Sequence, residues 1–158
     1  MKTYNIMLSK VFPATHPRKG EPTYFSQKVQ ASKYPTSFPQ ITQPKLHTIR
    51  ANHPLWAKRI AEVVAGEAEI CLRQWTGKPY RSKTQEIMRL TAEDGVGIQC
   101  LTFYDGHVIY PVIDDRYQPS IKEISANDGL SKDDWVEWFR HDDLSQPMAV
   151  IQFTSFRY

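Results

Sequence analysis

The hexapeptide Lys45-Leu46-His47-Thr48-Ile49-Arg50 places an ammonium group, an imidazole, a hydroxyl and a guanidinium within six residues. A threonine hydroxyl is a poor nucleophile at neutral pH and needs a neighbouring group to take its proton. A lysine can take that proton if burial lowers its pKa, and a histidine can act as a base or as a hydrogen-bonding partner of a ligand. The polar side chains of the hexapeptide are therefore predicted to line a concavity, where they could bind a polar ligand or take part in proton transfer.

The pattern of these residues predicts a short strand over Lys45–Arg50. Polar side chains are interleaved with Leu46 and Ile49, an imperfect alternation that fits a strand with one polar face better than a helix. In a regular strand, Lys45 and Thr48 point to opposite faces, so a shared site requires the strand to bulge or end between them. Without catalysis, the charged side chains would be solvated and Thr48 and His47 would be packing residues of the strand.

A second candidate site is the basic loop Gly77–Lys83, which follows the next predicted strand. The cations able to contact phosphates and the rings able to stack on an unpaired base are Arg50, Arg73, Lys78, Arg81 and Lys83, with Trp75 and Tyr80. The loop lacks the spacing of a Walker phosphate loop, so a nucleotide triphosphatase site is not predicted. RNA binding and simple exposure to solvent both remain as interpretations of this loop.

Charge is unevenly distributed along the chain. Residues 1–83 carry 14 Lys and Arg against 4 Asp and Glu, a net charge of +10, whereas residues 84–158 carry 6 against 13, a net charge of −7. A basic half of this kind is a candidate phosphate-facing surface. The two halves could equally neutralise each other across the fold.

Length and composition predict one globular domain over residues 1–158, with a Pro-rich insertion at about residues 30–44. The apolar fraction of 41% and the charged fraction of 23% are typical of a soluble protein. We expect a cytoplasmic protein, because no run of about 18 apolar residues and no signal-peptide stretch occurs. We expect no metal and no cofactor, since the cysteines and histidines lack metal-ligand spacing.

Periodicity and capping residues predict the elements that must position these side chains. Helices are expected over Tyr24–Val29, over about His53–Ala65 with Asn52 as its N-cap, and after Ser131. Pro119 argues against a regular element in residues 116–126. Further strands are expected at residues 4–8, 70–75, 84–90, 96–103, 107–113 and 148–153. Short strands at this spacing favour a barrel or a sandwich.

The chain combines a short amphipathic helix bearing Phe25 and Val29, the Lys45-x-x-Thr48-Ile49-Arg50 strand, a polar turn and helix near Asp128, and a closing strand. This combination resembles the ASCH family of PUA-like β-barrels. Within that family, the chain is most similar to the small bacterial amidohydrolases that deacetylate N4-acetylcytidine, and Lys-x-x-Thr-Ile-Arg is the specific match. The resemblance implies an α+β fold, a PUA-like (ASCH-type), mostly antiparallel β-barrel with flanking helices.

The resemblance also implies catalytic roles for three residues. The lysine and threonine of the family correspond to Lys45 and Thr48. When Trp135 is aligned with the first buried apolar position of the family's late helix, the family's acidic residue corresponds to Asp128. Asp128 would then orient the lysine or pass a proton to the leaving amine. The family's acid is a glutamate, one methylene longer than aspartate, and its tight connection before the lysine is replaced here by Gln30–Pro44.

Three functions remain as hypotheses. The first is the binding of RNA or a modified nucleoside in a basic cleft formed by residues 45–50, the 77–83 loop and the segment near Asp128. The second is an amidohydrolase that uses the Lys/Thr/Asp set to cleave the acetyl amide of N4-acetylcytidine-like nucleosides. The third is a non-catalytic protein-interaction module presenting Trp135 and Trp138, although these tryptophans are better explained as core beneath the last helix.

Overall fold

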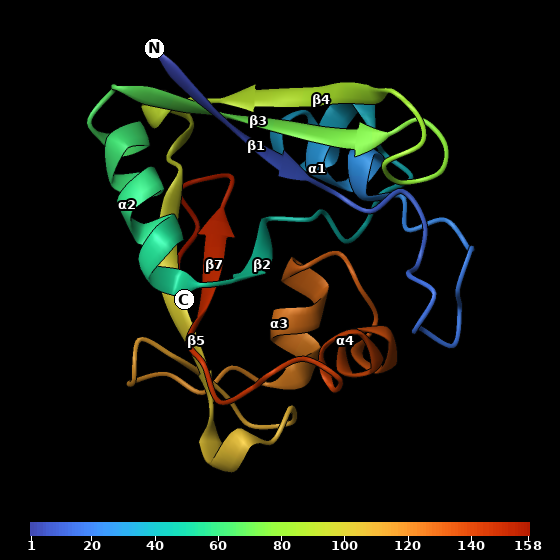
Figure 1. Cartoon of the computed structure of the whole chain (residues 1–158), viewed down its shortest axis with the longest axis vertical. Coiled ribbons are helices and arrows are strands. Elements are labelled where there is room, and N and C mark those ends of the chain that lie inside the picture. The colour runs from blue at the N-terminus through green and yellow to red at the C-terminus, as the bar shows by residue number, and fades with distance from the viewer.

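The structure is a computed structural model that describes all residues from 1 to 158, and it contains seven strands and four α-helices. The strands are β1 (Lys2–Met7), β2 (His47–Ala51), β3 (Ala68–Trp75), β4 (Thr84–Leu90), β5 (Gly97–Phe103), β6 (Pro111–Ile113) and β7 (Met148–Gln152). The helices are α1 (Phe25–Lys33), α2 (His53–Val64), α3 (Ile121–Asn127) and α4 (Lys132–Phe139), and Figure 1 shows their arrangement.

The strands form two separate sheets. One sheet has the order β1-β3-β4, and the other has the order β2-β7-β5-β6. β1 pairs with β3 in parallel, and all other neighbours are antiparallel. In the view of Figure 1, the strands of the first sheet run across the top of the molecule and those of the second run down from it.

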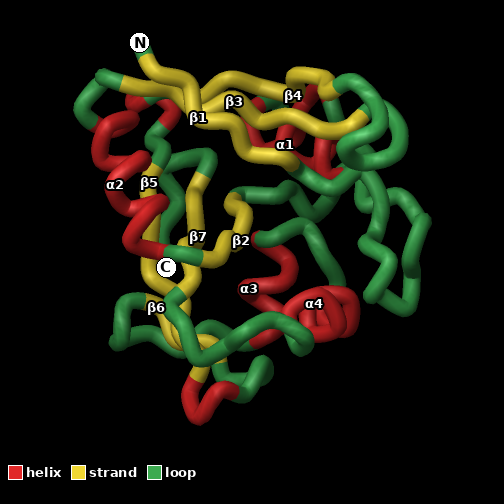
Figure 2. The backbone as a smooth tube through the Cα atoms, viewed as in Figure 1, coloured by secondary structure: helices red, strands yellow, loops and turns green.

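The predicted barrel is wrong, because neither sheet closes. The fold is α+β, as expected, but it consists of a three-stranded and a four-stranded sheet with helices around them (Figure 2). The two sheets are not hydrogen-bonded to each other, so each keeps two edges without a strand partner. β7, inside the second sheet, is buried along its whole length.

Apolar side chains from both sheets and from the helices form one core of 26 buried residues. α2 contributes Trp56, Ile60 and Val63 to the core, whereas Leu55 and Val64, which the sequence also predicts on the apolar stripe, are exposed. Trp135 of α4 is completely buried and packs against Phe139, so it belongs to the core and not to an exposed interface. No helix is both long enough and apolar enough to cross a membrane.

Capping signals predicted two helices well. The side chain of Asn52 accepts a hydrogen bond from the Leu55 amide at the start of α2, and Ser131 caps α4 in the same way. The predicted strand over residues 84–90 has the bounds of β4. The Pro-rich segment 30–44 is mostly irregular, although α1 continues into it as far as Lys33.

Three other predictions about local structure are wrong. The strand expected over Lys45–Arg50 begins at His47, so Lys45 precedes it. A helix, α3, begins after Pro119, because the proline precedes the N-cap Ser120 and therefore interrupts no hydrogen bond of the helix. β6 spans only three residues, since the segment after β5 first forms a short 3₁₀ turn.

Candidate functional site

Lys45 lies outside the strand that carries Thr48, and this placement lets both residues line one cavity. β2 begins two residues after Lys45. The Lys45 amide donates a hydrogen bond to the carbonyl of Lys28 in α1 (3.0 Å), and the Leu46 amide donates to the carbonyl of Asn127 in α3 (2.7 Å). The chain is therefore bound to two helices before it joins the sheet, and the alternation of a strand does not apply between residues 45 and 48.

The structure brings Lys45 and Asp128 together as a buried ion pair. The Lys45 ammonium donates to Oδ1 of Asp128 and to the Asp128 carbonyl oxygen, both at 2.7 Å. Each residue is only 2% exposed. The ammonium also lies 4.1 Å from the centroid of the Phe25 ring in α1, a cation–π contact. Two helices and the segment before β2 thus fix the position of one charged nitrogen.

The turn after α3 brings Asp128 close to Lys45. Asp128 is the first residue beyond the helix, and Gly129 follows it with a φ of +78°, in the region that favours glycine. A Cβ atom at position 129 would lie 3.1 Å from the Cβ of Lys45. A glycine at this position therefore satisfies both the backbone conformation and the close approach of the lysine.

Burial and charge shift the pKa values of both partners. Burial lowers the pKa of Lys45, because the ammonium loses its hydration, and the Asp128 carboxylate opposes that shift. Burial alone would raise the pKa of Asp128, but the Lys45 charge and the adjacent His47 ring outweigh burial and hold it below its usual value. Asp128 is therefore an anion at neutral pH, and Lys45 releases its proton more readily than a solvated lysine does.

Thr48 and the ion pair line a small cavity of about 110 Å³. The polar lining includes Lys45, Thr48, Arg50 and Asp128, and Phe25, Leu130 and Trp138 are among the apolar lining residues. Thr48 is 4% exposed, and its hydroxyl has no hydrogen-bond partner within the protein. No direct hydrogen bond joins Lys45 to Thr48. The cavity therefore presents an unpaired hydroxyl beside a buried ammonium–carboxylate pair.

A larger groove of about 650 Å³ adjoins this cavity. The two hollows share four lining residues, Ile49, Arg50, Trp138 and Phe139. Arg50 donates from Nη2 to the carbonyl of Met7, but its buried Nε has no partner in the protein. A guanidinium with one unsatisfied donor therefore lies between the cavity and the groove.

His47 lies on the other side of Asp128 from Lys45. Its ring is completely buried, with Nδ1 at 3.5 Å from Oδ1 of Asp128 and Nε2 at 2.6 Å from the Tyr158 hydroxyl. The nearer contact is a strong hydrogen bond, and the longer one is an electrostatic contact. Burial lowers the pKa of His47 below 6.5, so the ring is neutral in the folded protein.

The free energy of unfolding should therefore fall as the pH drops below about 6.5. The unfolded chain binds a proton at His47 first, so stability from the neutral ring is present above pH 6.5 and is lost below it, by at most about 1.4 kcal/mol per pH unit. Urea denaturation at neutral and mildly acidic pH measures this slope. His47→Asn should reduce it, whereas His107→Gln, at an exposed position, should leave it unchanged. A slope that persists in His47→Asn would assign the effect to another group.

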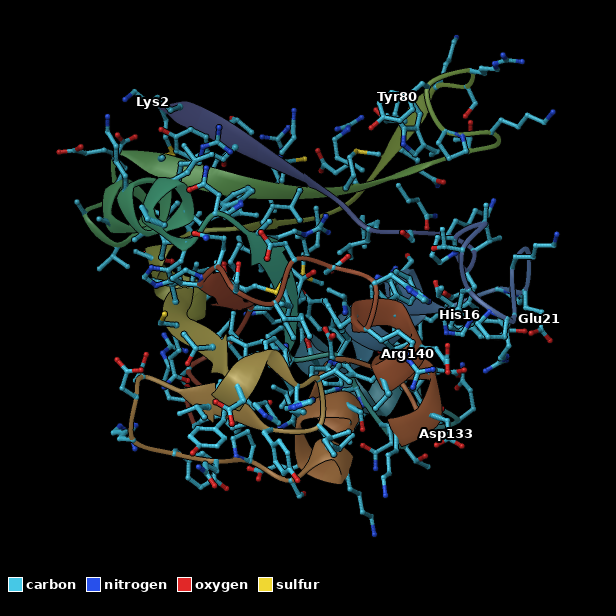
Figure 3. All side chains as sticks on the ribbon, turned by 60° about the horizontal axis from the view of Figure 1, so that its bottom comes forward. Lys2, His16, Glu21, Tyr80, Asp133 and Arg140 are labelled. Atoms are coloured by element: carbon cyan, nitrogen blue, oxygen red, sulfur yellow. The ribbon has the colours of Figure 1, made fainter.

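The basic loop does not contribute to the cavity. Lys78, Arg81 and Lys83 are exposed around the connection between β3 and β4, and none of them forms an ion pair. Figure 3 labels Tyr80 in this connection, close to the ends of the two strands, and it is 89% exposed. The single basic cleft expected from the sequence is therefore divided into a buried cavity and a separate exposed loop.

Arg73 and Trp75 lie at the base of the same hairpin. Nε of Arg73 donates to the Thr84 hydroxyl (3.0 Å), so this guanidinium is bound to the neighbouring strand. The Trp75 and Tyr80 rings are 5.1 Å apart and inclined by 50°. These two rings form an aromatic pair in the same hairpin as the cations of the loop.

Several residues of the site gave no signal in the sequence. Phe25, Trp138 and Phe139 line the cavity, although their spacing in the chain predicts only core positions. Tyr158 is bound to His47 but lies 111 residues from it in the chain. No group of three or more His, Cys, Asp or Glu side chains is arranged to hold a metal ion. The chain matches no protein-family model, no curated protein and no solved structure.

Proposed function

We propose that this protein hydrolyses the amide bond of a small acylated amine, with Thr48 as nucleophile, Lys45 as the group that moves the proton, and Asp128 as the partner that holds Lys45. The observation that carries the proposal is the buried Lys45–Asp128 pair on the same cavity as an unpaired threonine hydroxyl. An isolated buried ion pair is costly and is weak evidence for stability, so a functional role is a reason for its presence. The Lys-x-x-Thr-Ile-Arg resemblance supports an N4-acetylcytidine-like nucleoside as substrate.

The reaction needs one proton to move in each direction. Neutral Lys45 accepts the proton of the Thr48 hydroxyl through one bridging water while Oγ1 attacks the acyl carbon. Arg50 lines the cavity without a carboxylate partner, and its unpaired Nε can donate a hydrogen bond to the oxygen anion of the tetrahedral intermediate. The C–N bond then breaks, and the Lys45 ammonium gives its proton to the leaving amine. Water hydrolyses the resulting ester, which releases the carboxylic acid and restores the hydroxyl.

The sizes of the two hollows fit a substrate with a small acyl group. The inner cavity of about 110 Å³ is below the usual range for a whole ligand, which is roughly 300–1,000 Å³. The adjoining groove of about 650 Å³ lies within that range. An acetyl group in the inner cavity and a nucleoside in the groove would meet at Arg50.

Incubation of the purified protein with N4-acetylcytidine tests the proposal. We expect equal amounts of cytidine and acetate, measured by chromatography. Lys58→Ala, which removes an exposed lysine on α2 that lines neither hollow, should retain the activity. The absence of acetate from N4-acetylcytidine, both as the free nucleoside and within an RNA oligonucleotide, would contradict this function.

A second proposed function, RNA binding, is supported by the hairpin between β3 and β4. Its three exposed cations have no carboxylate partner, and the same hairpin carries an aromatic pair of which the Tyr80 ring is exposed. Tyr80 has a φ of 62°, a conformation that is uncommon for a residue with a side chain and that clusters at functional sites. Unpaired cations beside an accessible ring are the groups that bind phosphates and stack on bases of single-stranded RNA.

Arg81→Ala should weaken binding of a single-stranded RNA oligonucleotide and reduce the salt dependence of the affinity by about one phosphate contact. Fluorescence anisotropy at several salt concentrations measures both quantities. Lys122→Ala removes one positive charge on α3 and should have little effect. Equal losses in the two variants would indicate a general charge effect and would contradict a site at the loop.

We also propose a cytoplasmic location. Both cysteines, Cys71 and Cys100, are free thiols, and unpaired thiols are typical of a reducing compartment. The buried Cys71 has no nearby cysteine with which to form a disulfide.

A further inference from the structure

His47 and Tyr158 form a layer of contacts behind the Asp128 carboxylate. His47 precedes Thr48 on β2, so its side chain lies on the opposite face of the strand from the cavity. Its ring lies between the Tyr158 hydroxyl and Oδ1 of Asp128, and the same Oδ1 accepts the hydrogen bond from Lys45. A continuous series of four side chains therefore runs from Tyr158 to the lysine of the cavity.

The donors in this series are assigned from the hydrogen bonds around them. Asn127 donates from Nδ2 to the Tyr158 hydroxyl oxygen (3.2 Å), which leaves the phenolic proton free to point at Nε2 of His47. The imidazole proton is then on Nδ1, facing the Asp128 carboxylate. The other tautomer would place the Nδ1 lone pair against an anion at 3.5 Å. The favourable arrangement therefore has Tyr158 donating to His47, and His47 pointing its own N–H at Asp128.

Tyr158 is held in place from several sides. Its amide donates to Oε1 of Gln99 (2.8 Å), and Arg116 donates from Nη2 to its carbonyl oxygen (2.8 Å). Its ring stacks with that of Tyr117 at 6.2 Å. These contacts leave the phenol little freedom, so it can fix the tautomer and the orientation of the histidine.

Resting on the hydrolysis proposed above, we infer that His47 and Tyr158 are positioning residues that act through Asp128 to set the proton affinity and the direction of Lys45. Neither residue lines the cavity, so neither touches the substrate. The N–H of His47 draws negative charge from Oδ1 of Asp128. A carboxylate oxygen with less charge holds the Lys45 proton less tightly, and the lysine is more often neutral when Thr48 requires a base.

Removal of the His47 donor should therefore raise the pKa of Lys45. The acidic limb of the rate–pH profile reports deprotonation of the base, so it should move to higher pH. The charged and titratable groups near His47 are Asp128, Lys45 and Tyr158. Lys45 is also close to Arg50 and Lys28. Tyr158 is also close to Glu123 and Tyr117. The two His47 variants leave all of these groups in place, and Tyr158→Phe changes only Tyr158.

Three variants test the inference on the full chain. His47→Leu removes both ring nitrogens and should lower kcat roughly 10-fold to 100-fold with little change in KM, the size of effect known for outer hydrogen-bond partners of metal-bound histidines. His47→Asn keeps an N–H near the position of Nδ1 and should restore most of kcat and the wild-type pH profile. Tyr158→Phe frees the tautomer and should shift the acidic limb in the same direction as His47→Leu.

The outcomes separate this inference from the function on which it rests. An inactive wild-type protein overturns the proposed hydrolysis. An active wild-type protein, with a His47→Leu profile that stays in place or moves to lower pH, overturns only the positioning roles. If His47→Leu does not fold, the shift of the acidic limb of the rate–pH profile is measured in Tyr158→Phe instead. ¹⁵N NMR of the His47 ring provides a reading without substrate: a proton on Nε2 in the wild-type protein would overturn the inference.

Discussion

Replacement of Thr48 by valine should lower kcat for acetate release roughly 10³-fold or more, because valine keeps the shape of threonine and removes only the attacking oxygen. Removal of a nucleophile is among the largest single effects seen in enzymes that form covalent intermediates. The side chain is almost completely buried, and its hydroxyl has no partner in the protein. The change should therefore leave the fold intact, as circular dichroism can show.

Two control variants make this result specific. Thr48→Ser retains a hydroxyl at the same position and should keep measurable activity. Ser9 also lines the cavity and is the other hydroxyl there, so Ser9→Ala should remain close to wild type. Loss of activity in Ser9→Ala with retention in Thr48→Val would identify Ser9 as the nucleophile and contradict the assignment.

Replacement of Lys45 by methionine should lower the free energy of unfolding by about 3–5 kcal/mol. Methionine fills similar space but leaves the Asp128 carboxylate buried without its cation, and the Asp128 carbonyl loses a donor as well. Urea denaturation followed by tryptophan fluorescence measures the change. This effect does not depend on any activity, so it tests the geometry of the site by itself.

A double variant shows whether the loss comes from the unpaired charge. Lys45→Met combined with Asp128→Leu removes both charges and should recover much of the lost stability, since apolar replacements of buried ion pairs are often neutral. Lys78→Met, on the exposed hairpin, should change stability by no more than about 0.5 kcal/mol. A similar small change in Lys45→Met would mean that Lys45 and Asp128 are not paired in the folded protein.

The sequence predicted those parts of the fold that local signals determine. Asn52 and Ser131 are caps whose side chains bind amides three residues later, and they marked the starts of α2 and α4. The parallel pairing of β1 with β3 could not be predicted, because the alternation within a strand says nothing about which strand lies beside it. The barrel was inferred from strand spacing and from the family resemblance, and neither determines whether a sheet closes.

The candidate site was predictable only in part, for the same reason. Lys45 and Asp128 are separated by 83 residues, and only the family resemblance suggested that they meet. Tyr158 lies in the segment Ser155–Tyr158, which has no spacing typical of a site. The basic loop was grouped with the cavity because both carry cations, but the length of the hairpin holds its tip away from β2.

The parallel register of β1 also has a consequence for the order in which the sheet assembles. β3 and β4 are joined by a short connection, so their antiparallel ladder closes a small loop and can form early. β1 pairs residue by residue from Lys2 with Ala68, and it must wait until α1, β2 and α2 have bridged that distance. We expect the N-terminal strand, although it precedes all others in the chain, to dock last onto a hairpin that is already formed.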